Sequence, residues 1–140
     1  MIQQSSRTSC YAPLRVVVYS SDAHLRNSVA QALGSLPDRS GPPVQFTNTA
    51  TQFALIETME SGDVDVAILD GEASPAGGIG LAKQLKDELL QCPPIVVLMA
   101  RPVDAWLACW AGVEAVAPRA FDALALRDAI VPLLRSRLVV

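Results

Sequence analysis

Short aliphatic and β-branched runs alternate with amphipathic stretches along most of the chain, and this alternation limits the possible folds more than any other feature. The apolar runs are 14–19, 44–47, 64–70, 95–99 and 113–117. Runs of this length, bounded by polar residues, glycine or proline, predict strands. Four of the runs are almost continuously apolar and 44–47 alternates as an outer strand would, so the pattern predicts a parallel sheet covered on both faces.

Helical periodicity fills the segments between these strands. Apolar residues recur at three- and four-residue spacing in segments 22–36, 49–61, 81–90, 103–111 and 121–135. We expect Asp22 or Ser21 to cap the first helix, and the second to pack around Phe53, Ile56 and Met59. A turn-rich connection at 37–43 and a glycine-rich loop at 71–80 complete the pattern. The chain is therefore expected to form one doubly wound α/β domain.

Length and charge restrict the function classes. The 140 residues fit one domain, which we place at 13–140 after a polar, flexible tail at 1–12. Hydrophobic residues make up 51% of the chain, enough for a sizeable core. Eleven basic against fourteen acidic residues give a net charge of −3, which argues against direct nucleic-acid binding. No apolar run predicts a signal peptide or a membrane span, so we expect a cytoplasmic protein that does not insert into a membrane.

The cysteines predict neither a disulfide framework nor a metal site. Cys10, Cys92 and Cys109 are widely spaced, form no CxxC pair, and are accompanied by one histidine, His24. We expect reduced thiols, with Cys109 as a small apolar filler, and His24 solvated at a helix start.

Polar residues gather where the expected strands end. In open parallel sheets, ligands bind at the carboxyl ends of the strands, beside the switch in strand order. Those ends carry Ser20, Ser21, Asp70, Met99 and Arg119. This group is the candidate site.

Three segments carry a family resemblance. They are "VDVAILD" at 64–70, "PIVVLMA" at 94–100 and "ACWAGVEAVAPRAF" at 108–121. With the order of the elements, they resemble the CheY-like receiver domain of two-component response regulators over about residues 14–136. The resemblance implies a flavodoxin-like (βα)5 fold with strand order 2-1-3-4-5, and it places Asp70 in the phosphoacceptor position.

The resemblance also implies that the family's phosphorylation chemistry is degenerate here. Counted back from Arg26, which matches a common arginine of the first helix, the family's acidic pair falls on Ser20 and Ser21. That pair and the acceptor aspartate hold the magnesium ion that neutralises the incoming phosphoryl group. Two neutral hydroxyls cannot replace the carboxylates, although Asp22 and Glu72 lie close in sequence. We therefore expect no metal, no cofactor, no catalytic residue and no useful phosphorylation of Asp70.

The family's switch residues are replaced as well. Met99 stands where the family has a Thr or Ser, Val116 stands at the switch aromatic, and Arg119-Ala120 replaces Lys-Pro. Methionine tends to fill gaps, so we expect Met99 to plug the pocket. Arginine can form forked hydrogen bonds with a carboxylate, so we expect Arg119 to hold Asp70 ionised, across a trans Arg119–Ala120 peptide bond.

A tryptophan stripe marks a candidate interface. Val103, Trp106 and Trp110 share one side of the expected helix 103–111, while three alanines at 105, 108 and 111 form a second stripe that suits close packing on the sheet. We expect the tryptophans to face outward, where such residues often act as binding hot spots. In receiver domains the face made by this helix, the fifth strand and the last helix is the usual docking surface.

The sequence supports three function classes. The first is an atypical single-domain receiver that acts noncatalytically as a protein-binding or accessory module, either as a homodimer or on a partner within a larger assembly such as a transcription or respiratory complex. The second is a phosphorylation-dependent response regulator that uses Asp70. The third is a flavodoxin-like FMN-binding protein, suggested by the hydroxyl-rich "YSSDAH" turn.

Overall fold

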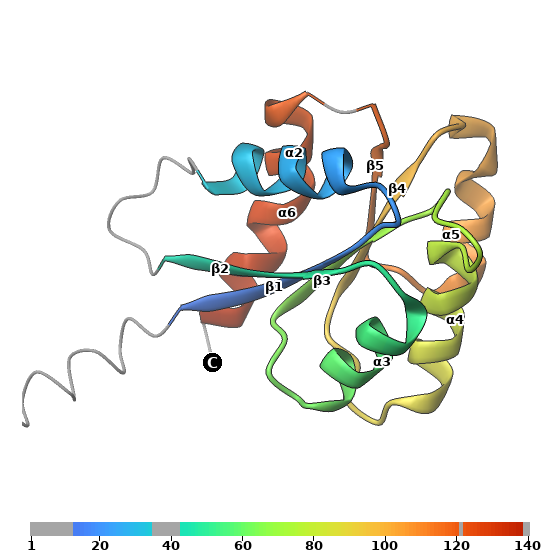
Figure 1. Ribbon diagram of the computed structural model, residues 1–140, viewed down its shortest axis with the longest axis horizontal. Coiled ribbons are helices and arrows are strands. Elements are labelled where there is room, and N and C mark those ends of the chain that lie inside the picture. Colours follow the sequence, from blue (N-terminus) through green and yellow to red (C-terminus); the bar gives the residue numbers. More distant parts are fainter. Residues whose placement is uncertain (1–12, 35–42, 121, 139–140) are drawn as a thin grey trace, which may run out of the picture.

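A computed structural model describes residues 13–34, 43–120 and 122–138, so the tail expected at 1–12 lies outside the described residues. The described chain forms a sheet with helices on both sides (Figure 1). The strands are β1 (Leu14–Tyr19), β2 (Val44–Thr49), β3 (Val66–Asp70), β4 (Ile95–Met99) and β5 (Ala115–Pro118). The helices are α2 (Ala23–Gly34), α3 (Gln52–Glu60), α4 (Gly78–Glu88), the 3₁₀ turn η1 (Pro102–Asp104), α5 (Ala105–Ala111) and α6 (Ala123–Leu138).

The sheet has the expected topology. All neighbouring strands pair in parallel, in the order β2-β1-β3-β4-β5. Strands β3 and β4 are buried along their whole length, whereas β2 at one end of the sheet is only partly covered. Three of the four apolar runs form the central strands β1, β3 and β4, and the alternating run forms the outer strand β2, as the sequence predicts. The fourth apolar run forms β5, which lies at the other edge of the sheet and is only partly buried.

Two apolar clusters hold the layers together. Helices α2 and α6 cover one face of the sheet, where Val29 and Ile130 are buried against alternate residues of the strands. Helices α3, α4 and α5 cover the other face, where Leu55 and Leu85 are buried in the second cluster. Because successive strand residues point to opposite faces, each central strand contributes to both clusters. No described helix has the length and apolar character needed to cross a membrane.

Two local expectations were wrong. Helix α4 begins at Gly78 rather than at residue 81, so part of the glycine-rich segment is helical. Phe53 does not enter the core, since 76% of its surface is exposed, and α3 buries Leu55 instead. The expected packing of Met59, which is buried, and of Ile56, which packs against the core, is confirmed. Positions two apart on a helix are separated by roughly 200°, so Phe53 and Leu55 cannot both face the sheet.

Candidate functional site

Four polar or chemically distinctive side chains meet at the carboxyl edge of the sheet. Ser20 follows β1, Asp70 ends β3, Met99 ends β4, and Arg119 follows β5. The parallel register aligns these strand ends, since Asp70 is opposite Leu98 and Met99 is opposite Pro118. The structure thus brings together four of the five strand-end residues singled out in the sequence.

The carboxylate of Asp70 lies at the centre of this group and is 1% exposed. Arg119 donates to it twice, from Nε to Oδ1 at 2.8 Å and from Nη2 to Oδ2 at 3.2 Å. The hydroxyl of Ser20 donates to Oδ2 at 2.7 Å, and the backbone N–H of Glu72 donates to Oδ1 at 2.9 Å. Each carboxylate oxygen therefore accepts two hydrogen bonds, and the expected contact between Arg119 and Asp70 is confirmed.

The site favours the ionised form of Asp70. Burial by itself raises the pKa of this carboxyl group, but the hydrogen bonds from Arg119, Ser20 and the Glu72 backbone and the positive charge of Arg119 outweigh burial and hold the pKa below its usual value. The hydrogen bonds and charge of Asp70 in turn raise the pKa of Arg119. The two groups form a charge-assisted pair inside the site.

Asp22 caps helix α2. Its Oδ1 accepts from the backbone N–H groups of His24 at 2.9 Å and Leu25 at 3.4 Å, as expected for a capping aspartate. His24 itself is exposed, as predicted. These helix N-terminal amides are the donors that a phosphate-binding turn would offer to FMN, and here a carboxylate of the protein already occupies them. The geometry does not favour the flavodoxin-like alternative.

The other acidic and hydroxyl candidates do not complete a magnesium site. The Oγ of Ser21 accepts from the backbone N–H of Ser74 at 3.2 Å and is exposed, as is Glu72. Asp22 Oδ2 lies 3.8 Å from Arg119 Nη2, on the same cation that pairs with Asp70. Within the described ranges, no three histidine, cysteine, aspartate or glutamate side chains form a group that could hold a metal ion. The residues present do not fit the magnesium ion that the family resemblance implies.

The switch positions are filled by apolar side chains. Met99 is 5% exposed and its side chain belongs to the core cluster under α3, α4 and α5; that it plugs the site remains a prediction. Val116, in β5, is 40% exposed and is a β-branched aliphatic residue with no ring to rotate. The Arg119–Ala120 peptide bond is trans, as expected. Among the described residues, the peptide bond in the cis form is Ser74–Pro75.

Two features of the site were missed in the sequence. The hydroxyl of Tyr19 donates to the carbonyl of Ala76 at 2.6 Å and ties the loop after β3 to the end of β1. A Cβ at Gly78 would lie 2.6 Å from the backbone oxygen of Asp70, so only glycine allows α4 to begin so close to β3. The available signals were a tyrosine directly before Ser20 and a glycine-rich segment directly after Asp70.

The tryptophans lie on the surface, as predicted. Val103 and Trp106 are each 66% exposed and Trp110 is 57% exposed, and the ammonium group of Lys83 lies 5.6 Å from the ring centroid of Trp110. We call Val103, Trp106 and Trp110 the tryptophan face.

The opposite side of α5 differs in part from expectation. Ala108 and Ala111 are buried against the sheet, but Ala105 is exposed because it begins the helix, before α5 meets the sheet. Cys109 is also exposed, so its interpretation as a core filler was wrong. Cys109 lies three positions after the exposed Trp106, so the two side chains share one side of α5, away from the buried Ala108 and Ala111.

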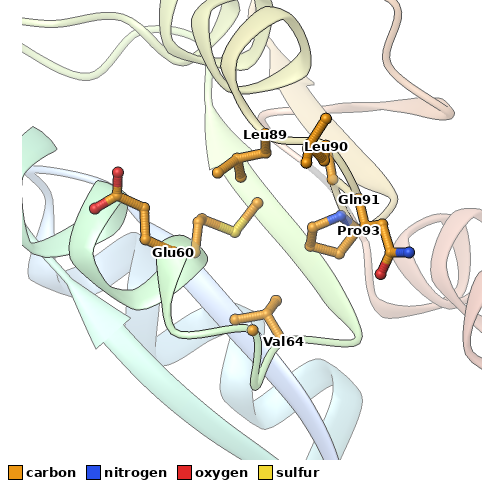
Figure 2. A pocket seen from close by; sticks show the side chains of 9 residues that line it. Glu60, Val64, Leu89, Leu90, Gln91 and Pro93 are labelled. Carbon is orange, nitrogen blue, oxygen red and sulfur yellow. The ribbon is translucent and has the colours of Figure 1, made fainter.

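A pocket of about 500 Å³ lies at the other end of the strands (Figure 2). Its lining residues come from the end of α3 and from the segments before β3 and β4, and they are Met59, Glu60, Gly62, Val64, Leu89, Leu90, Gln91, Cys92 and Pro93. Leu89 and Pro93 point inward, whereas Glu60 points away from the cavity. Burial raises the pKa of the Cys92 thiol, which keeps it protonated. None of the candidate site residues lines this pocket.

The comparisons identify the family. An uncharacterized response regulatory protein, found in two strains of Mycobacterium tuberculosis, is 46% identical over 123 residues, which cover 88% of this chain and 92% of that protein. No family model matches the chain. The chain belongs to the response regulator family.

Solved receiver structures share the fold. The receiver domain of a response regulator from Bermanella marisrubri aligns with a TM-score of 0.73 and 19% identity, covering 86% of this chain and 97% of that one. The chemotaxis response regulator CheY4 of Vibrio cholerae aligns with a TM-score of 0.70 and 16% identity, covering 87% and 99%. The described structure therefore has the fold of a CheY-like receiver domain.

Asp70 lies at the position where the family resemblance places the phosphoacceptor. Its carboxylate ends β3 and accepts hydrogen bonds from an arginine and a serine. Such an arrangement stabilises a negative charge that is already present. The other carboxylate beside Arg119 is that of Asp22, which caps α2, and the described residues contain no group of three metal-ligating side chains that could hold a divalent cation.

Proposed function

We propose that this response regulator is an atypical receiver, which acts noncatalytically and without a cofactor as a protein-binding module in the cytoplasm. Its conformation would be set by the internal pair of Asp70 and Arg119 rather than by a phosphoryl group. The observation that carries this proposal is the occupation of both Asp70 oxygens by hydrogen bonds from the protein itself.

The charge balance of the site supports this reading. Phosphorylation would replace a carboxylate that pairs with Arg119 by a group of higher negative charge, and in receivers a magnesium ion compensates that increase. Here Ser20 and Ser21 supply hydroxyls, and Asp22 is engaged in capping α2. Arg119 is the cation that contacts Asp70 in the described chain. Its guanidinium group must move away before an oxygen of Asp70 can attack a phosphoryl donor.

The tryptophan face supports a binding role. Two indoles on the short helix α5 and a valine in the preceding turn η1 are more than half exposed. Removing such surface from water favours association, and tryptophan is among the residues that most often dominate binding energy at an interface. We propose that α5, with β5 and α6 beside it, forms the docking surface for a protein partner, which can be a subunit of a larger assembly or a second copy of this chain.

Intact mass spectrometry tests the phosphorylation part of the proposal. The protein is incubated with acetyl phosphate and magnesium, beside its Asp70→Asn variant and a phosphorylatable receiver as a positive control. We expect no mass change in the wild type. A stoichiometric gain of one phosphoryl group that is absent from Asp70→Asn would favour the phosphorylation-dependent alternative.

Paired variants test the docking part. The double variant Trp106→Ala/Trp110→Ala should weaken capture of the partner while leaving the melting temperature nearly unchanged, because both side chains are largely exposed. Phe53→Ala/Leu90→Ala is the matched control, since it removes two large exposed apolar side chains away from α5. Equal losses of capture in the two variants would show that the tryptophan face is not the docking surface.

A further inference from the structure

The outer edge of β2 lacks the features that usually prevent strand pairing between molecules. Proteins commonly protect such edges with charges, proline, bulges or very short strands. Strand β2 has six residues, "VQFTNT", with no charge and no proline, and it pairs with β1 in continuous register. The opposite edge of the sheet differs, because β5 has four residues and ends at Pro118, which has no backbone N–H.

The register shows which backbone groups of β2 are available. Leu14 donates to the carbonyl of Pro43, and Ser20 donates to the carbonyl of Thr49, so the odd-numbered positions direct their backbone groups toward β1. In a strand the direction alternates from residue to residue. The N–H and C=O groups of Val44, Phe46 and Asn48 therefore point away from β1, toward the outer edge.

We propose that β2 is a self-association edge, where the strand pairs antiparallel with β2 of a second copy around a two-fold axis at Phe46. In this register Phe46 is opposite its own symmetry mate, and Val44 is opposite Asn48 of the other copy. These are the residues whose backbone groups point outward, so each pair can exchange two hydrogen bonds. The two sheets would join into one continuous sheet of ten strands.

The side chains suit this pairing. Val44 and Phe46 are half-buried against the cluster under α2 and α6. In the dimer, the exposed part of Phe46 would be covered by Phe46 of the second copy, and that of Val44 by its Asn48. On the other face, Gln45 and Thr47 are exposed and would lie opposite one another across the axis. A two-fold interface is formed by the same surface patch on both copies, so a charged residue there would lie near a residue of the same charge. Strand β2 carries no charge, so this repulsion does not arise.

A charge-pattern experiment tests both the surface and its register. Gln45→Lys/Thr47→Lys would place lysine opposite lysine across the axis, whereas Gln45→Lys/Thr47→Glu would place lysine opposite glutamate. Both variants replace the same two exposed residues with charged ones, so the main difference between them is the charge pairing across the dimer axis. Circular dichroism and thermal melting confirm folding, and sedimentation equilibrium over a dilution series measures association.

The expected results are specific to this edge. The wild type should dimerise reversibly, the lysine–lysine variant should dimerise at least tenfold more weakly, and the lysine–glutamate variant should retain the dimer. Trp106→Ala/Trp110→Ala should leave this dimer intact, and the amides of Val44, Phe46 and Asn48 should become protected from hydrogen exchange as concentration rises. A wild type that stays monomeric throughout, or equal dimerisation of the two charge variants, would overturn the proposal.

Discussion

Replacing Arg119 by methionine tests the central feature of the site. Methionine has a long flexible side chain, so it retains part of the packing of the arginine stem while it removes the charge and the donors. Asp70 would keep its bonds from Ser20 and from the Glu72 backbone, but it would lose both bonds from Arg119. The variant therefore leaves a buried carboxylate without its cation.

The cost follows from how the two partners are buried. Breaking a buried ion pair by removing one partner typically costs about 3–5 kcal/mol. The Asp70 side chain is 1% exposed but that of Arg119 is 32% exposed, so solvent screens part of the interaction. We therefore expect the free energy of unfolding to fall by about 2–3 kcal/mol at neutral pH, near the value of hydrogen bonds to charged groups.

The pH dependence gives the prediction a sign. The folded pKa of Asp70 is depressed, so its stabilising contribution is present above the usual carboxyl pKa and is lost as pH falls through the folded value. In Arg119→Met the pKa of Asp70 should rise, because burial then acts with less opposition. Protonation would relieve the unpaired charge, so the stability difference between wild type and variant should shrink from pH 7 toward about pH 4.

Urea unfolding at several pH values, with an NMR titration of the Asp70 carboxyl group, measures both effects. Arg101→Met is the matched control, because Arg101 is 72% exposed and lies 3.8 Å from Asp104, a surface pair expected to contribute under about 1 kcal/mol. A loss in Arg119→Met no larger than in Arg101→Met would refute the reasoning. So would a loss that is the same at pH 7 and at pH 4.

Two further predictions concern the loop between β3 and α4. Gly78→Ala should destabilise the fold by several kcal/mol, because its Cβ would meet the backbone oxygen of Asp70 at 2.6 Å. Gly80→Ala, with open space around its Cβ, should instead stabilise α4 by up to about 1 kcal/mol. Equal shifts of the melting temperature in the two variants would contradict this prediction. Tyr19→Phe should cost about 1 kcal/mol through loss of the bond to the Ala76 carbonyl. Hydrogen exchange in the loop should become faster in that variant, and unchanged exchange would count against the anchoring role of Tyr19.

The sequence by itself determined the order and type of the elements. Central strands are buried on both faces, so they appear as continuous apolar runs, and the predicted bounds of β1 and β4 agree with the structure. Parallel connections then bring all the carboxyl ends to one edge. For this reason the pairing of Asp70 with Arg119 could be expected before any coordinates, with the family resemblance supplying the alignment.

Tertiary structure alone decided how individual side chains are directed. A periodic pattern does not fix the rotation of a short helix, so the exposure of Phe53, Ala105 and Cys109 depended on where α3 and α5 begin and which residues first meet the sheet. The bond from Tyr19 to Ala76 and the close approach at Gly78 join residues whose contact is set by strand register and loop path. These are long-range distances, and local residue preferences do not encode them.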